Sequence, residues 1–181
     1  MDVLIERCAG LDVHRDTVVA TVRRPGPGGV RRSETRTFTT MTGQLEALAD
    51  WLAAQQVTLV GMESTGIYWK PVYCVLEDRF SVWVINAEHL RNVPGRKTDV
   101  ADSMWIAQLI EHGLVSPSFV PPRHVRLLRD LTRHGRRLTE ERTRTIQRLE
   151  KVLQDAGIKL TSVASTILGK TGRAILAALL A

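Results

Sequence analysis

The chain lacks the features that mark disulfide-rich, zinc-binding and membrane proteins. It has two cysteines among its 181 residues, Cys8 and Cys74, and both sit in apolar stretches. No set of cysteines and histidines has the spacing of zinc ligands, so we expect reduced, buried thiols. No apolar run reaches the roughly 20 residues that span a membrane, and residues 1–6 lack the basic start of a signal peptide. We therefore expect a cytoplasmic protein with no membrane partner.

Positive charge is what the chain has in excess. The formal net charge is +6 and the pI is near 9.9, which favours a polyanionic partner such as DNA or RNA. Between residues 121 and 151, ten basic residues outnumber four acidic ones, so this segment accounts for the whole excess. A merely soluble basic protein is the plainer alternative. Nearly all these residues are arginines, which suit bidentate phosphate contact, and the candidate contacts are Arg129, Arg133, Arg136, Arg137, Arg144 and Arg148.

Apolar patterns predict an α/β fold that begins with two hairpins. Branched and apolar runs predict strands at 8–14, 17–23, 36–40, 58–62 and 81–85. Residues 25–29 are too rich in proline and glycine for a regular element. Helical spacing predicts a helix that Thr42 caps and further helices at 68–77, at 98–112 (capped by Thr98) and at 123–156. Because helices separate the later strands, part of the five-stranded sheet should be parallel.

The chain divides into four segments on this pattern. They are a domain at 1–115, a proline-rich linker at 116–122, a helical arm at 123–156 and a further segment at 157–181. The arm would span roughly 50 Å as one helix, at about 1.5 Å per residue. Residues 175–180 resemble a helix without a stop signal, so we expect a fragment with a truncated C-terminal region.

Four acidic residues occupy places where a carboxylate is costly unless a cation lies nearby. Asp12 lies inside an apolar strand, and its side chain should face away from those of Leu11 and Val13. Glu63 ends another strand, where α/β proteins place their sites. Asp99 and Asp102 open a helix and share the face that continues toward the core. Favourable interaction with a helix N-terminus is the plainer explanation for Glu63 and Asp99.

Together these acids predict a divalent-metal site that acts on phosphates. Mg²⁺ prefers oxygen ligands, and Mn²⁺ is a plausible substitute. Paired ions can stabilise the attacking and leaving oxygens in phosphoryl transfer. His14 is the best candidate for orienting Asp12. Arg96 and Lys97 precede the acidic helix start and are placed to hold a phosphate near the metal.

The helical arm also carries an imperfect apolar seam. The seam could pair with a second copy of the chain, leaving the arginines free to hold nucleic acid. A solvated amphipathic helix is the alternative. The seam residues are Val125, Leu128, Leu131, Leu138, Ile146, Leu149 and Leu153.

Three segments carry a resemblance to a known family. They are residues 10–14 (GLDVH), 62–69 (MESTGIYW) and 94–102 (PGRKTDVAD). In this order they resemble the DEDD transposases of the insertion-sequence one-ten family, and the likeness covers most of residues 8–156.

The resemblance implies a ribonuclease H-like fold of the RuvC type and a function in DNA recombination. On the family's pattern Asp12, Glu63, Asp99 and Asp102 are the four catalytic, metal-binding acids. Family members add a C-terminal domain with a nucleophilic serine, which completes the site of another subunit, and they use a structured guide RNA. Ser162 and Ser165 do not match that serine motif. The resemblance further implies that the arm is a coiled coil for homo-oligomer formation and RNA contact, in a cytoplasmic protein that acts at the nucleoid.

Two other functional classes remain open on the residues alone. Actin-like ATPases also carry an aspartate in an early hairpin, but their later glycine-rich phosphate loop does not occur here. A non-catalytic module could dimerise and bind structured RNA through residues 123–156.

Overall fold

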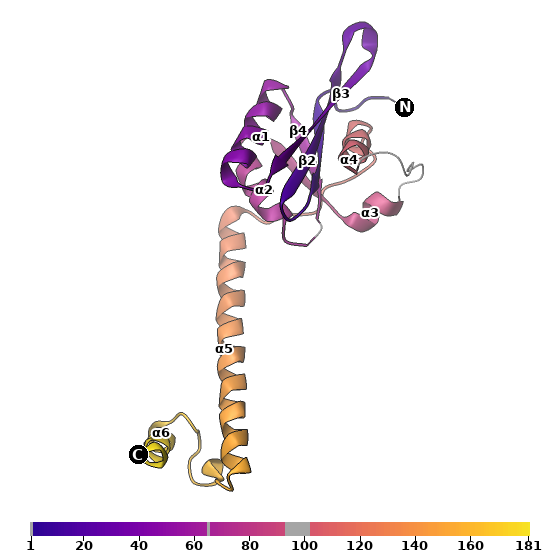
Figure 1. The fold of residues 1–181 in the computed structure, drawn as a ribbon. Coiled ribbons are helices and arrows are strands. Elements are labelled where there is room, and N and C mark those ends of the chain that lie inside the picture. The colour runs from indigo at the N-terminus through magenta and orange to yellow at the C-terminus, as the bar shows by residue number, and fades with distance from the viewer. Residues whose placement is uncertain (1, 65, 93–101) are drawn as a thin grey trace. The chain divides into compact units, whose positions relative to one another are not determined.

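A five-stranded mixed sheet forms the centre of the first of two compact units, Met1–Val120 and Pro121–Ala181. The computed structural model describes residues 2–64, 66–92 and 102–181 (Figure 1). In the order of the sheet, the strands are β3 (Arg31–Thr39), β2 (Thr17–Pro25), β1 (Cys8–Val13), β4 (Leu59–Glu63) and β5 (Ser81–Ile85). The β1–β2 and β2–β3 pairs are antiparallel, whereas β4 is parallel to both β1 and β5. The predicted hairpin start and parallel portion are therefore confirmed.

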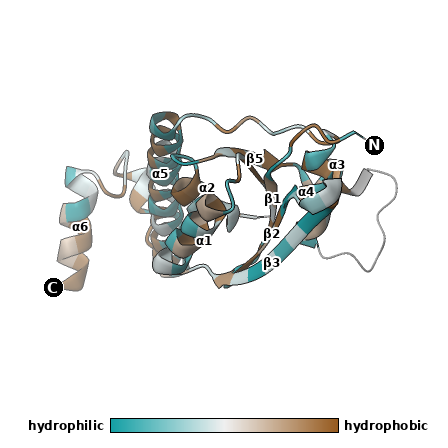
Figure 2. Cartoon of the chain, turned by 90° about the horizontal axis from the view of Figure 1, so that it is seen from above, coloured by the Kyte–Doolittle hydropathy of each residue, from teal (hydrophilic) through white to brown (hydrophobic). Residues whose placement is uncertain are grey.

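Helices cover both faces of this sheet. Helices α1 (Thr42–Ala54) and α2 (Trp69–Leu76) pack on one face, and α4 (Asp102–Glu111) packs on the other (Figure 1). A short helix, α3 (Ala87–Asn92), precedes the undescribed residues 93–101. In Figure 2 the same sheet lies between the α1–α2 layer and α4, and the outer strand β3 is largely hydrophilic.

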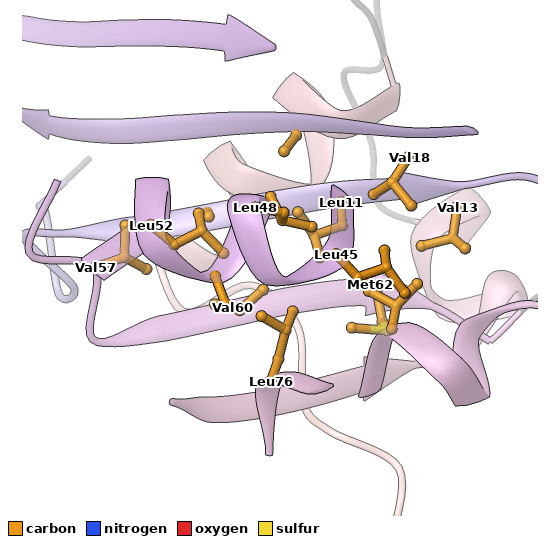
Figure 3. Packing of buried hydrophobic residues seen from close by; sticks show 14 of the residues in the cluster. Leu11, Val13, Val18, Leu45, Leu48, Leu52, Val57, Val60, Met62 and Leu76 are labelled. Atoms are coloured by element: carbon orange, nitrogen blue, oxygen red, sulfur yellow. The ribbon is translucent and has the colours of Figure 1, made fainter. Parts of the chain in front are cut away.

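Alternation along β1 sends its side chains to two different cores. Leu11 and Val13 join the larger core with Val18, Leu48 and Met62, which Figure 3 shows packed between the sheet and α1. Cys8 belongs instead to the core that includes Ile106, Leu109 and Ile110 of α4. Because successive residues of a strand face opposite sides, Gly10 and Asp12 share the α4 face with Cys8. The predicted orientation of Asp12, away from Leu11 and Val13, is confirmed.

The second unit is built on one long helix. Helix α5 spans Arg123–Asp155, and α6 spans Lys170–Leu180. The helix stops at Ala156, and Gly157 follows with a φ of 78°, a conformation that glycine adopts without a Cβ clash. A small apolar core forms at this end from Leu153, Leu160, Ala164 and Ile167. The helix predicted at 123–156 is confirmed, while the four-part division of the chain stays a prediction.

Several predicted boundaries were wrong. Strand β3 begins at Arg31 rather than Arg36, because it pairs with β2 over nine residues despite its charged, exposed side chains. Thr42 lies inside α1, whose cap position is Met41 with no side-chain hydrogen bond. The turn at 25–29 contains a single 3-10 turn, η1 (Pro27–Gly29). Helix α3 is not predicted by the apolar pattern, although the Asn86 side chain accepts a hydrogen bond from the backbone N–H of Glu88. The predicted cap Thr98 lies outside the described residues.

Candidate carboxylate site

Two of the predicted acids lie side by side at the carboxyl ends of parallel strands. Leu11 of β1 pairs with Met62 of β4, so Asp12 and Glu63 are the next residues on neighbouring strands. In each strand a glycine lies two positions earlier, Gly10 before Asp12 and Gly61 before Glu63. A Cβ added to Gly10 would overlap Ser103 O, and one added to Gly61 would overlap Ile110 Cδ1, so both glycines face α4. Both acids therefore point to the α4 face.

The third described acid comes from the start of that helix. Asp102 is the first residue of α4 and is exposed, while Ser103 beside it is fully buried. The sequence pattern predicts that Asp102 begins the buried stripe; instead the stripe runs through Ile106, Leu109 and Ile110, and Asp102 sits on its solvent-facing end. The partial positive charge at the N-terminal end of the helix interacts favourably with a carboxylate at this position.

The charges of Glu63 and Asp102 both act on the pKa of Asp12. The side chain of Asp12 is 22% exposed, and burial raises the pKa of its carboxyl above the ordinary value of 3.8. His14 opposes this shift, whereas the negative charges of Asp102 and Glu63 add to the rise in the Asp12 pKa. Mutual repulsion of this kind predicts that a cation between the carboxylates would stabilise them.

His14 contacts one of these acids, Asp12. Its Nε2 lies 3.0 Å from Asp12 Oδ2, and its ring is otherwise mostly exposed. A ring nitrogen at this distance from Oδ2 restricts the rotamer of the Asp12 carboxyl. The contact is consistent with the orienting role predicted for His14.

The described acids do not by themselves form a closed ligand set. In the described ranges no group of three His, Cys, Asp or Glu side chains is close enough to hold a metal ion. The fourth predicted acid, Asp99, and the predicted phosphate contacts Arg96 and Lys97 lie outside those ranges. The all-oxygen donor set nevertheless fits a hard divalent cation by its chemistry.

The sequence reasoning missed a set of buried polar residues around α4. Thr21 Oγ1 lies 2.8 Å from Ser103 Oγ, and both residues are fully buried. Glu111, at the last position of α4, is also fully buried and pairs with Arg23 and Arg31. Their spacing in the sequence could have indicated this set, because Ser103, Ala107 and Glu111 are four residues apart and so lie on one face of the helix.

The predicted nucleic-acid contacts on α5 are all exposed. Arg133, Arg137, Arg144 and Arg148 follow one another at intervals of four, seven and four residues, which places them on one face of the helix. Arg136 donates to Glu140 at 2.8 Å, and Arg129 is also exposed. These side chains form the arginine face of α5.

The apolar seam of α5 divides into a covered and an exposed part. Leu153 is buried, and Ile146 and Leu149 pack on the small core of the second unit. Leu128, Leu131 and Leu138 are between 52% and 69% exposed. No helix in the described part of the chain is both long enough and apolar enough to cross a membrane.

A family comparison decides what kind of protein carries these acids. The model of the transposase family DEDD_Tnp_IS110 matches residues 9–158, which include the sheet except for its first residue, Cys8, and all of α4 and α5. The chain belongs to this transposase family. The resemblance found in the three sequence segments is thereby confirmed.

Solved structures were also compared with this transposase. Thermus thermophilus RuvC, alone and in complex with a Holliday junction substrate, matches at 13% and 12% identity, each with a TM-score of 0.43 over 62% of this chain and 99% of RuvC. An Aquifex aeolicus member of the Ppx/GppA family matches at 16% identity and a TM-score of 0.33, over 48% of this chain and 37% of that one. No curated protein matches the chain. The strand order and directions of the sheet are those of the predicted ribonuclease H-like fold.

Proposed function

We propose that the first unit of this transposase is a metal-dependent domain that acts on DNA phosphodiesters. Asp12, Glu63 and Asp102, together with Asp99, would hold Mg²⁺ or Mn²⁺. The observation that carries the proposal is the strand register, which places Asp12 and Glu63 side by side at the carboxyl ends of two parallel strands, on the face that α4 covers. Three carboxylates on one face of the sheet, in a transposase, are suited to a divalent cation and a phosphate.

Each side chain has a distinct task in this proposal. When bound, the metal would supply charge stabilisation to the phosphate in the transition state. Asp12 and Glu63 offer oxygens from two neighbouring, hydrogen-bonded strands, so their spacing is set by the sheet. Asp102 adds an exposed carboxylate from the start of α4, on the side open to a substrate. His14 holds the Asp12 carboxyl in one rotamer through the 3.0 Å contact.

The proposal extends to the arm and to partners. The arginine face of α5 would contact a structured guide RNA or DNA, and the exposed leucines of α5 would pair with a second copy. Arg96 and Lys97 would hold a phosphate beside Asp99 and Asp102. A serine-bearing domain outside residues 1–181 would complete the reaction.

Calorimetric titration with Mn²⁺ tests the metal site. We expect Glu63→Gln and Asp102→Asn each to weaken Mn²⁺ binding by roughly tenfold or more, because each removes a charged oxygen ligand. Glu46→Gln is a matched control, since Glu46 is an exposed acid on α1 away from the site. The control should bind Mn²⁺ like the unchanged protein.

Unchanged Mn²⁺ affinity in both Glu63→Gln and Asp102→Asn would rule out the assignment. Equal weakening in Glu46→Gln would instead show a non-specific effect of net charge. Tryptophan fluorescence checks that each variant is folded, because all four tryptophans lie within residues 51–105 of the first unit.

A further inference from the structure

Helix α4 brings Asp102 to the sheet, and its contacts with the sheet are of two kinds. Apolar contacts from Ile106, Leu109 and Ile110 supply burial. Burial of this kind is non-directional, so it does not by itself choose between nearby positions of the helix along the sheet. A shift of one helical turn would move Asp102 by about 5.4 Å, which is enough to separate it from Asp12.

Directional contacts hold α4 at both ends. Near its start, Ser103 Oγ lies 2.8 Å from Thr21 Oγ1 of β2, and Thr21 Oγ1 lies 2.8 Å from Thr35 Oγ1 of β3. At its last residue, Glu111 Oε2 accepts from Arg23 Nε of β2 at 2.6 Å, and Glu111 Oε1 pairs with Arg31 Nε of β3. Strand β2 therefore binds both ends of the helix, while β3 binds its last residue directly and its start only through Thr21.

The middle of the helix is fixed by close approach. A Cβ at Gly10 would overlap the backbone atoms Ser103 O and Ala107 N. Ser103, Ala107 and Glu111 thus lie on one face of α4, and this face packs on β1 and β2. Asp102 precedes the first of these residues, and the last of them, Glu111, forms the ion pairs.

A contribution to the stability of the fold does not explain why the Glu111 carboxylate is buried. Glu111 is fully buried, and the side chains of Arg23 and Arg31 are only 15% and 19% exposed. Desolvation offsets much of the attraction in such a cluster, and apolar side chains of similar volume often stabilise a fold equally well. Apolar side chains in these positions would lack the directional ion pairs that fix the position of α4.

We infer that Glu111 is a positioning residue, which acts with Arg23 and Arg31 to fix α4 along the sheet and so to place Asp102 beside Asp12. This inference rests on the proposed metal site. It assigns a task to three residues that do not reach the site. Their effect on the metal is transmitted through the helix.

The test replaces the whole cluster by apolar side chains. In Arg23→Met/Arg31→Met/Glu111→Leu we expect Mn²⁺ binding to weaken by roughly tenfold, as for other supporting residues of metal sites. The free energy of unfolding in EDTA should stay at or above that of the unchanged protein. The substitution removes two positive charges and one negative charge, which by itself would favour a cation. Weaker binding would therefore come from misplaced ligands.

An engineered disulfide tests whether fixing the position of α4 restores Mn²⁺ binding. Thr21→Cys/Ser103→Cys, added to the apolar variant in a Cys74→Ser background, would fasten the start of α4 to β2 when oxidised. We expect Mn²⁺ affinity to return on oxidation and to fall again on reduction. A cluster that served only stability would show no such dependence on the disulfide.

Mn²⁺ affinity within twofold of the unchanged protein, in a folded apolar variant, would overturn the inference. If that variant does not fold, Glu111→Gln keeps the shape of the side chain and removes the charge that pairs with both arginines, and unchanged affinity there overturns the inference equally. The variant Asp102→Asn distinguishes a failure of the positioning role from a failure of the metal site. If Asp102→Asn weakens binding and the folded cluster variant does not, only the positioning role fails. If neither Asp102→Asn nor Glu63→Gln weakens binding, the metal site itself fails.

Discussion

Asp12 lies on a strand that is covered on both faces, whereas the arginines of α5 stand exposed along one helix. The two units therefore hold their candidate functional groups in different ways. In the first unit, a sheet register, a close helix approach and buried polar contacts fix the acids. In the second, local helical structure alone spaces the long side chains of the arginine face.

The difference matches what each partner requires. A metal site needs its ligands within about 0.5 Å of the productive geometry, which only a packed scaffold supplies. Phosphate contacts need charge along a path, and a flexible arginine can adjust to each phosphate. We therefore expect the first unit to be sensitive to small changes of shape and the second to changes of charge.

The largest effect should be a loss of stability when one methyl group is added to the first unit. Gly10→Ala would place a Cβ against the backbone of Ser103 and Ala107, which cannot move aside as a side chain can. We expect the free energy of unfolding to fall by about 3 kcal/mol or more, toward the upper range for overpacked cores. Urea unfolding followed by tryptophan fluorescence measures this, with Gly43→Ala as the control because its Cβ would meet open space. A decrease below about 1 kcal/mol would mean that α4 is not held closely.

The second largest effect should come from removing positive charge from the helical arm, and it concerns RNA binding. In Arg133→Gln/Arg137→Gln/Arg144→Gln we expect roughly tenfold weaker binding of an RNA hairpin and a shallower salt dependence, by about one counterion for each phosphate that the variant no longer neutralises. The matched arginine-to-lysine variant keeps the charge and should keep most of the salt dependence. Fluorescence anisotropy at several salt concentrations gives both quantities. An unaltered slope in the glutamine variant would place the nucleic-acid contacts elsewhere.

A pH effect should separate the acids from the arm. Because the pKa of Asp12 is raised in the folded state, the neutral form is favoured on folding, and stability falls as the pH rises through that pKa. Asp12→Asn should therefore stabilise the metal-free protein at pH 7 and give a smaller gain below the ordinary pKa of 3.8. Urea unfolding in EDTA at both pH values checks the sign. Asp16→Asn, at an exposed neighbouring acid, should change neither value, and a gain that grows at low pH would contradict this account.

The smallest effect should be a stabilisation of the arm. Gly135 lies inside α5, and a Cβ added there would meet nothing within 4 Å. Gly135→Ala should raise the stability of this helix by about 0.5–1 kcal/mol, because glycine loses more backbone freedom on folding. Thermal melting followed by circular dichroism at 222 nm is a suitable measurement. A destabilising methyl group at this position would show that something packs against the helix there.

Local patterns predicted much of this structure and missed what depends on distant pairing. Alternation predicted that Asp12 faces away from Leu11, and helical spacing predicted α5. The early start of β3 at Arg31 was missed, because its charged residues are strand-forming only when paired with β2. Glu111 was missed for the same reason, since its partners Arg23 and Arg31 lie 80 or more residues away in the sequence. The grouping of the acids into one metal site predicted that Asp12 and Glu63 lie on one face, but the exposure of Asp102 was not predicted.

One crossed measurement tests the central claim that metal and nucleic acid are held by different units. Mn²⁺ affinity, and RNA-hairpin affinity in EDTA, would be measured for Asp12→Asn and for the triple arginine-to-glutamine variant. We predict that Asp12→Asn loses Mn²⁺ binding and keeps RNA binding, and that the arginine variant does the reverse. Loss of Mn²⁺ binding in the arginine variant, or its full retention in Asp12→Asn, would contradict the account.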